Sequence, residues 1–185
     1  SDRNGGFRDA LEIIDAVEAT CPRPVRSHIN ILPPDDFSLL ALADGIDEIT
    51  FAMEVWDDAL LRDICPGKAG ETGRDGFLRL FEAGVKRFGP GRVSCNFVVG
   101  LEPLESLLEG CRFMADMGIV PTVAVFHPDP KTPFAHKPSP SEDMLLEFAR
   151  ALGDIYASTG FQPYLLGCRR SSLDSEIYWG YFNDG

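Results

Sequence analysis

The sequence predicts an α/β fold, a partial TIM-type (β/α) barrel with parallel strands and about four to five βα units. Short apolar segments alternate with amphipathic helical segments along the chain, and parallel neighbours need such helical crossovers. The repeating unit spans roughly 25–40 residues, which suits barrels and doubly wound sheets. The 185 residues are too few for a complete eight-stranded barrel, which takes about 250.

The first third of the chain predicts two helices and two strands. Apolar residues at helical spacing predict a helix over 7–19. A strand over 25–32 ends at Pro33, because proline cannot continue it. Aspartates cap a short helix over 35–43, and a strand follows over 48–55.

The middle of the chain predicts two further helices and a third strand. Aspartates open a helix over 57–64, and the glycine-rich segment 67–73 reads as a loop. A long helix over 75–88 is closed by Gly89, and a strand follows over 92–99.

The last part of the chain predicts a helix over 103–117 and a strand over 119–126. A proline-rich loop runs through Pro140. Acidic residues in the first turn then favour a helix over 141–158. The tail is weakly periodic, with a short strand expected near 163–166.

Composition favours one domain, residues 1–185, with a leading helix in 1–24, core βα units in 25–134 and the last helix and tail in 135–185. The net charge of −12 disfavours nucleic acids and anionic membranes, which are polyanions. No apolar run is long enough to span a membrane, and no signal segment opens the chain. Five irregularly spaced cysteines fit reduced thiols, so we expect a cytoplasmic protein.

The strands alternate between a bulky apolar face and a small, polar face. The bulky face should meet the helices, which leaves the polar face for a ligand cavity. The alternative is that this face is simply exposed to solvent in an open sheet. The candidate substrate-binding residues on it are His28, Asn30, Ser94 and Asn96.

Several residues at predicted strand ends are candidates for ligand contacts. Glu54 suits ligand hydroxyls or amines, although a surface salt bridge fits equally. Gly100 permits close ligand approach, although a plain turn is an alternative. The glycine-rich loop around Lys68 lacks the spacing of a phosphate-binding Walker A loop. Among the three histidines, His28 suits substrate binding or acid–base work, or a structural role, and no metal motif is visible.

Six ordered segments carry a resemblance to a known family. They are ADGID at 43–47, FAMEVWD at 51–57, ICPGK at 64–68, FGPG at 88–91, VVGLE at 98–102 and the proline-rich segment 121–133. As an ordered set, over about residues 25–134, they resemble the biotin-synthase-like branch of the radical S-adenosylmethionine (SAM) enzymes.

The resemblance implies a SAM site at the strand ends and a small-molecule substrate on the polar face. The implied SAM-binding residues are Glu54, Val98, Gly100, Glu102, Phe126, His127 and Pro128. Arg169 in the tail joins the substrate residues, since arginine forks match carboxylates, although a capping or surface role fits equally.

The resemblance has two departures. The three cysteines spaced CxxxCxxC are absent, so the [4Fe-4S] cluster is expected only from a segment preceding Ser1. Ser94 stands where biotin synthase carries a cluster-ligating cysteine, which argues against biotin synthase itself. With the cluster, the family cleaves SAM to a 5′-deoxyadenosyl radical that abstracts hydrogen from the substrate. We therefore expect this chain alone to be inactive.

Two other functions stay open from the sequence. One is an aldolase- or epimerase-like barrel fragment that uses Glu54 and His28 for acid–base chemistry. The other is a non-catalytic half-barrel subunit. An open sheet has unpaired edges, so we expect a homodimer through them. SAM binding would separate the first reading from the enzyme alternative, and self-association would test the subunit.

Overall fold

The computed structural model describes residues 2–22, 26–164 and 173–180. The strands are β1 (His28–Asn30), β2 (Glu48–Glu54), β3 (Val93–Val99) and β4 (Val120–Val125). The helices are α1 (Arg3–Thr20), the 3-10 helix η1 (Phe37–Leu42), α2 (Asp58–Ile64), α3 (Pro66–Glu71), α4 (Gly73–Phe88), α5 (Leu104–Asp116), α6 (Glu142–Thr159) and α7 (Asp174–Tyr178).

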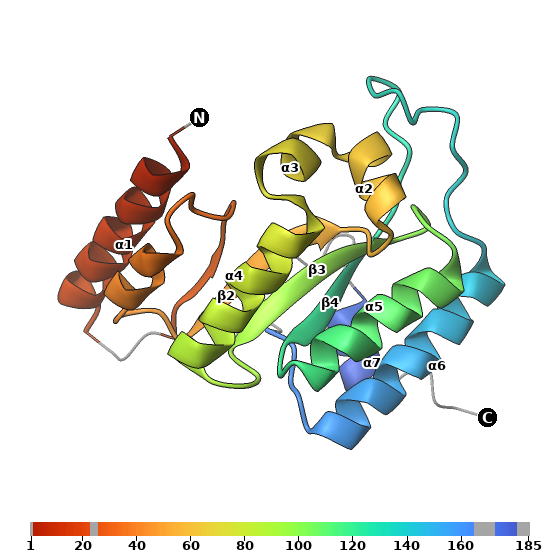
Figure 1. Ribbon diagram of the computed structural model, residues 1–185. Helices are drawn as coiled ribbons and strands as arrows, with labels where there is room; N and C mark the ends of the chain where they lie inside the picture. Colours follow the sequence, from red (N-terminus) through yellow and green to blue (C-terminus); the bar gives the residue numbers. More distant parts are fainter. Residues whose placement is uncertain (1, 23–25, 165–172, 181–185) are drawn as a thin grey trace.

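The four strands form one all-parallel sheet in the order β1-β2-β3-β4. Each crossover therefore places the next strand beside the previous one, always on the same side, as in a section of a barrel. In a doubly wound sheet the strand order would reverse. Figure 1 shows α4, α5 and α6 side by side along one face of the sheet. This confirms the predicted α/β fold with parallel strands.

The core lies between the bulky face of the sheet and these helices. Side chains of β2 and β3 on this face are fully buried, and α4 and α5 supply their neighbours. The fully buried side chains from these four elements include Ile49, Phe51, Met53, Phe77, Leu80, Phe81, Phe97, Leu107 and Met114. Each contributes about 1.5–3 kcal/mol by leaving water, so this layer holds the strand ends in place.

The glycine-rich segment predicted as a loop over 67–73 is helical, and that prediction was wrong. Pro66 occupies the first position of α3, where its missing N–H costs nothing and its fixed φ favours the helix. The strand predicted over 25–32 is shorter, with only His28–Asn30 paired to β2. No strand forms at residues 163–164, and the remainder of the expected fifth strand lies outside the described residues.

The outer edge of β4 is covered by side chains from the last two helices. Tyr156 donates its hydroxyl to the carbonyl of Pro121 at 2.7 Å, and Asp174 accepts from the amide of Val123 at 2.9 Å. Burial first, and Asp174 second, raises the pKa of Tyr156, which keeps the hydroxyl a donor. These contacts satisfy groups that would otherwise pair with another strand. A homodimer through sheet edges stays a prediction.

None of the helices within the described ranges is both long and apolar enough to cross a bilayer.

Candidate functional site

The carboxyl ends of three neighbouring strands bring the predicted SAM residues to one edge of the sheet. Glu54 is the last residue of β2, Gly100 follows β3, and Phe126 follows β4. The amide of Phe126 donates to the carbonyl of Val99 at 3.0 Å, which keeps the chain after β4 beside β3. In parallel α/β folds this edge is where ligands bind.

Glu54 has an unusual backbone and a close basic partner. Its φ is 77°, and it is the one non-glycine residue with positive φ among those described. The register between β2 and β3 shifts between Ala52 and Glu54, which is a β-bulge. Lys68 on α3 donates its Nζ to Glu54 Oε1 at 2.5 Å and to the carbonyl of Ala52 at 2.7 Å. Strained conformations of this kind concentrate at functional sites.

Glu102 is buried, and its carboxylate is bound within the protein. Oε1 accepts from the amide of Trp56 at 2.7 Å, and Oε2 accepts from the amide of Asp57 at 3.1 Å. The hydroxyl of Ser106 also donates to Oε2, at 2.6 Å. Glu102 therefore ties the segment after β2 to the start of α5. Its contact with SAM stays a prediction.

Trp56 is a packed anchor two residues beyond Glu54. Its ring lies against Gly110 of α5 and 4.9 Å from the ring of Phe113, measured between centroids. On the same ring, the guanidinium carbon of Arg74 lies 3.9 Å from the centroid. The Nε of Arg74 is buried and has no hydrogen-bond partner in the described part of the chain. Arg74 therefore packs on Trp56 from the first turn of α4.

The polar face of the sheet carries the predicted substrate residues in one layer. The register aligns Asn30 with Thr50 and Thr50 with Ser94. His28 Nε2 is joined to Thr50 Oγ1 by a hydrogen bond of 2.7 Å. Its ring stacks on Tyr164, with 4.2 Å between the ring centroids. Asn30 is exposed, whereas Ser94 is buried.

Asn96 continues this layer toward the strand ends. Its register partners are Ala52 on β2 and Thr122 on β4, and Thr122 Oγ1 donates to Asn96 Oδ1 at 3.3 Å. The alternation of the strands places all four predicted residues on one face, as expected. Their roles in substrate binding stay predictions.

The loop after β4 positions its residues differently. His127 and Pro128 are exposed, while Phe126 and Val98 are partly buried. The far end of the loop returns to the sheet at Gly100, where a Cβ would lie 2.8 Å from Pro140. With φ at 101°, this position favours glycine. Arg169 lies outside the described residues.

Sequence reasoning assigned no site role to four residues of this region. Thr50 and Thr122 follow from the strand alternation and could have been named from it. Lys68 and Tyr164 carry no such signal, because only packing brings α3 to β2 and the chain after α6 to β1.

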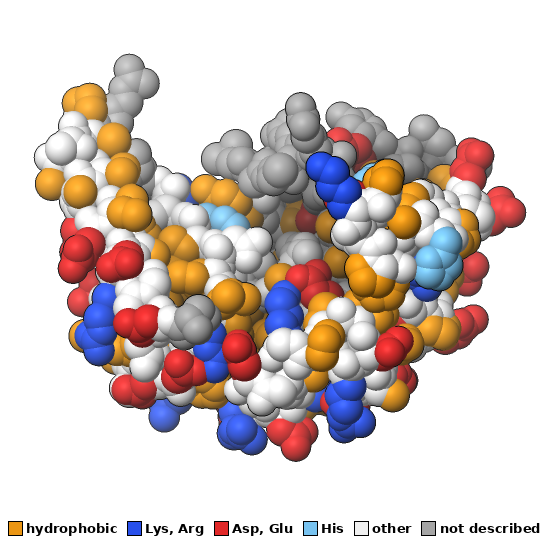
Figure 2. All heavy atoms as spheres, turned by 90° about the horizontal axis from the view of Figure 1, so that it is seen from above, with side chains coloured by type: hydrophobic (Ala, Val, Ile, Leu, Met, Phe, Trp, Pro, Cys, Tyr) orange, Lys and Arg blue, Asp and Glu red, His pale blue; other side chains and the backbone are white. Residues whose placement is uncertain are grey.

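Figure 2 looks down on the molecule from the side where α2, α3 and the loop after β4 lie. This side is hollowed, and a basic and an acidic side chain lie next to each other on the floor of the hollow. Charged side chains at the floor of a hollow suit a polar ligand.

The chain is similar to a bacteriochlorophyllide c C-7(1)-hydroxylase of Chlorobaculum limnaeum, 35% identical over 162 residues, which cover 83% of this chain. That hydroxylase is a radical SAM enzyme. The chain spans about 40% of the hydroxylase's length. No protein-family model matches the chain.

This similarity confirms part of the family resemblance. The chain is a partial homologue of a radical SAM enzyme, as the ordered motifs indicated. The biotin-synthase-like branch within that superfamily stays a prediction.

The cysteines of the described segments are not arranged to hold a cluster. Cys95 and Cys111 are buried, and burial raises the pKa of both thiols. Across those segments, no three or more His, Cys, Asp or Glu residues are grouped to hold a metal ion. The residues of the described segments do not fit an iron–sulfur cluster.

Acid should destabilise the protein through His28. Burial, with the Arg26 cation second, lowers the pKa of His28 from 6.5 to about 4. Between these values the unfolded chain takes up a proton that the folded chain does not, so the free energy of unfolding falls as the pH falls. The ring is partly exposed, so we expect a loss of about 1–2 kcal/mol.

Urea unfolding at several pH values from about 7 to about 4 measures this slope. His28→Gln should flatten it, whereas His127→Gln, at an exposed position, should leave it unchanged. An equal slope in wild type and His28→Gln would show that other groups cause the acid sensitivity.

Proposed function

We propose that this chain is the SAM- and substrate-binding portion of a radical SAM enzyme, with SAM at the carboxyl ends of β2–β4 and substrate on the polar face of the sheet. The partial homology to the hydroxylase carries this proposal. The position of Glu54, Gly100 and Phe126 at one edge of the parallel sheet supports it.

The residues at this edge fit SAM chemically. Glu54 offers a carboxylate acceptor for the nucleoside, and Gly100 lets Pro140, at the far end of the loop after β4, pack closely against the strand end.

SAM supplies the adenosyl group from which the superfamily generates its hydrogen-abstracting radical. The chain's own task is to bind and orient. The polar face offers Thr50, Asn96 and Thr122 as hydrogen-bonding groups. His28, which its lowered pKa keeps neutral, is a further hydrogen-bonding group on this face. Because the described cysteines do not fit the cluster, this chain alone should bind ligands without turning them over.

The substrate to test first is the one that the relative's name states, bacteriochlorophyllide c. A planar ring system of this size can stack on aromatic side chains. The stacked pair of His28 and Tyr164 provides an aromatic surface next to the polar face.

Calorimetric titration of the 185-residue chain with SAM tests the proposal. We expect binding that weakens about tenfold in Glu54→Gln, the scale of one charge-assisted hydrogen bond. Glu82→Gln, an exposed glutamate on α4, is the matched control and should bind SAM normally. A wild-type chain that does not bind SAM would overturn the proposal and favour the alternative, an aldolase- or epimerase-like barrel fragment that uses acid–base chemistry.

A further inference from the structure

Glu54 occupies a backbone conformation that the fold must hold in place. A left-handed backbone is unfavourable for a residue with a Cβ, by about 1–2 kcal/mol. The φ of 77° coincides with the bulge that separates Glu54 from Ala52 in register. The conformation aims the last side chain of β2 away from its ordinary strand direction, so some contact must make it the preferred one.

Lys68 provides that contact. Its ammonium bridges the two sides of the bulge, since it donates to the carbonyl of Ala52 and to the carboxylate of Glu54. Both side chains are largely shielded from solvent, with 21% of Lys68 and 24% of Glu54 exposed. A charge-assisted bond in such surroundings is stronger than one on the open surface.

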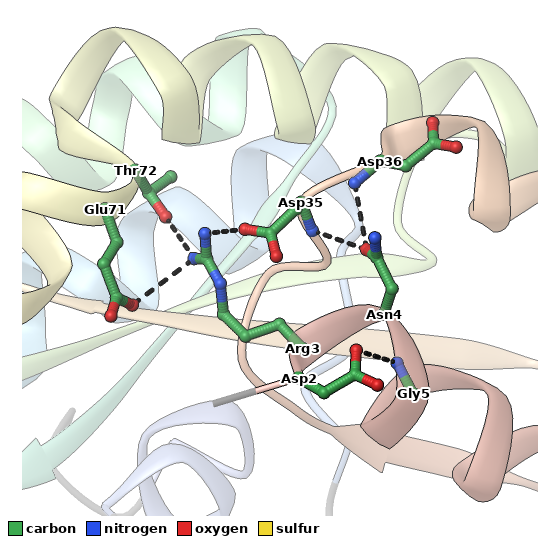
Figure 3. A network of polar contacts seen from close by, with 8 residues as sticks. All are labelled: Asp2, Arg3, Asn4, Gly5, Asp35, Asp36, Glu71 and Thr72. Atoms are coloured by element: carbon green, nitrogen blue, oxygen red, sulfur yellow. Dashed lines mark hydrogen bonds and ion pairs between the residues drawn. The ribbon is translucent and has the colours of Figure 1, made fainter.

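The helix that carries Lys68 is itself anchored. Figure 3 shows Arg3 of α1 reaching the end of α3, where it donates to Thr72 Oγ1 at 3.0 Å and lies 3.6 Å from Glu71 Oε2. Arg3 also pairs with Asp35. Only 10% of the Arg3 side chain is exposed, against 51% of Asp35 and 55% of Glu71. The network ties α3, and thereby Lys68, to α1 and to the segment before η1.

Within the described residues, the pairing leaves Glu54 with one compensated and one open oxygen. Oε1 binds Lys68, and no described residue donates to Oε2. A second cation at Oε2 would have to share the charge of a carboxylate that Lys68 already neutralises. A neutral hydroxyl donor meets no such competition.

We propose that Lys68 is a positioning residue that holds Glu54 in its left-handed conformation and reserves the open carboxylate oxygen for a ligand hydroxyl instead of a ligand cation. The ligand part rests on the proposed function, since it assumes that a nucleoside binds at this strand end. The conformational part is independent of it.

The conformational part is tested on the ligand-free 185-residue chain. The Cα and Cβ chemical shifts of Glu54 report whether its φ is positive. In Lys68→Met we expect these shifts to move to ordinary strand values, with the rest of the spectrum folded. Lys68→Gln gives the same test should the methionine variant fold poorly. Lys86→Met, on an exposed face of α4, should leave Glu54 unchanged. Unchanged Glu54 shifts in a folded Lys68 variant would overturn the positioning role.

The specificity part compares adenosine with 2′-amino-2′-deoxyadenosine, at a pH that protonates the amine. Wild type should favour adenosine by about tenfold, and Lys68→Met should reverse this preference because the carboxylate is then uncompensated. If the role of Lys68 were purely structural, Lys68→Met would weaken the binding of both nucleosides alike. An unchanged ratio of the two affinities would overturn the specificity part. If wild type binds neither nucleoside, the specificity part fails, the SAM titration separately decides the proposed function, and the Glu54 shifts still decide the positioning role.

Discussion

Glu102→Leu should lower the free energy of unfolding by about 2–5 kcal/mol. Glu102 is 5% exposed. Its carboxylate accepts hydrogen bonds from the amides of Trp56 and Asp57 and from the hydroxyl of Ser106. Leucine fills a similar volume but leaves these donors without acceptors, and each buried unmet donor costs about 1–3 kcal/mol. Denaturant unfolding measures the loss.

Glu102→Gln separates hydrogen bonding from shape. Glutamine keeps one acceptor oxygen but presents an amide donor to an N–H. The free energy of unfolding should therefore fall less than in Glu102→Leu, but still measurably. Glu105→Gln, on the exposed side of the first turn of α5, should stay within about 0.5 kcal/mol of wild type. If Glu102→Leu unfolds like the Glu105 control, the carboxylate is free for a ligand and its structural role is refuted.

Gly110→Ala should destabilise the protein by about 1–2 kcal/mol, against the usual helix preference for alanine. A Cβ at this position would lie 2.7 Å from Cβ and Cγ of Trp56, far inside contact distance. Trp56 is 3% exposed and is packed between Arg74 and Phe113, so it has little room to move. Overpacking of this kind costs about 1–3 kcal/mol, more than the ~1 kcal/mol that alanine gains in a helix.

Gly70→Ala is the matched control for this effect. Gly70 lies in α3, and a Cβ there would meet no atom within 4 Å. We therefore expect it to stabilise the chain by about 0.5–1 kcal/mol. Thermal or denaturant unfolding of both variants gives the comparison. Equal stabilisation by the two substitutions would mean that Trp56 moves aside freely and does not anchor the strand end.

Much of the fold was predictable because its signals are local. Alternation along β2 and β3 predicted which face meets the helices, and those side chains are fully buried. Capping aspartates marked real helix starts, since Asp57 accepts from the amide of Leu60 at the start of α2. The error at α3 has the same local origin: three glycines and a proline read as a loop, whereas Pro66 in fact begins a helix.

The candidate site was predictable only in part. The strand-end positions of Glu54 and Gly100 follow from where each strand stops, and the shared face of His28, Asn30, Ser94 and Asn96 follows from a period of two. What each side chain binds did not follow. Glu102 was named as a SAM contact, and in the structure its acceptors are used by amides 45 and 46 residues away.

The sequence by itself determined the alternation of strands and helices, the buried face of each strand and the position of each strand end, because these depend on neighbours a few residues apart. Only the tertiary structure decided the partners: Lys68 for Glu54 across 14 residues, Thr50 for His28 across 22, and Asp174 for the edge of β4 across 51. Such pairs depend on how helices of given lengths pack back onto the sheet. The periodicity of the sequence does not encode the distance between two side chains on different elements, and hydrogen bonds form only when donor and acceptor lie within about 3 Å of each other.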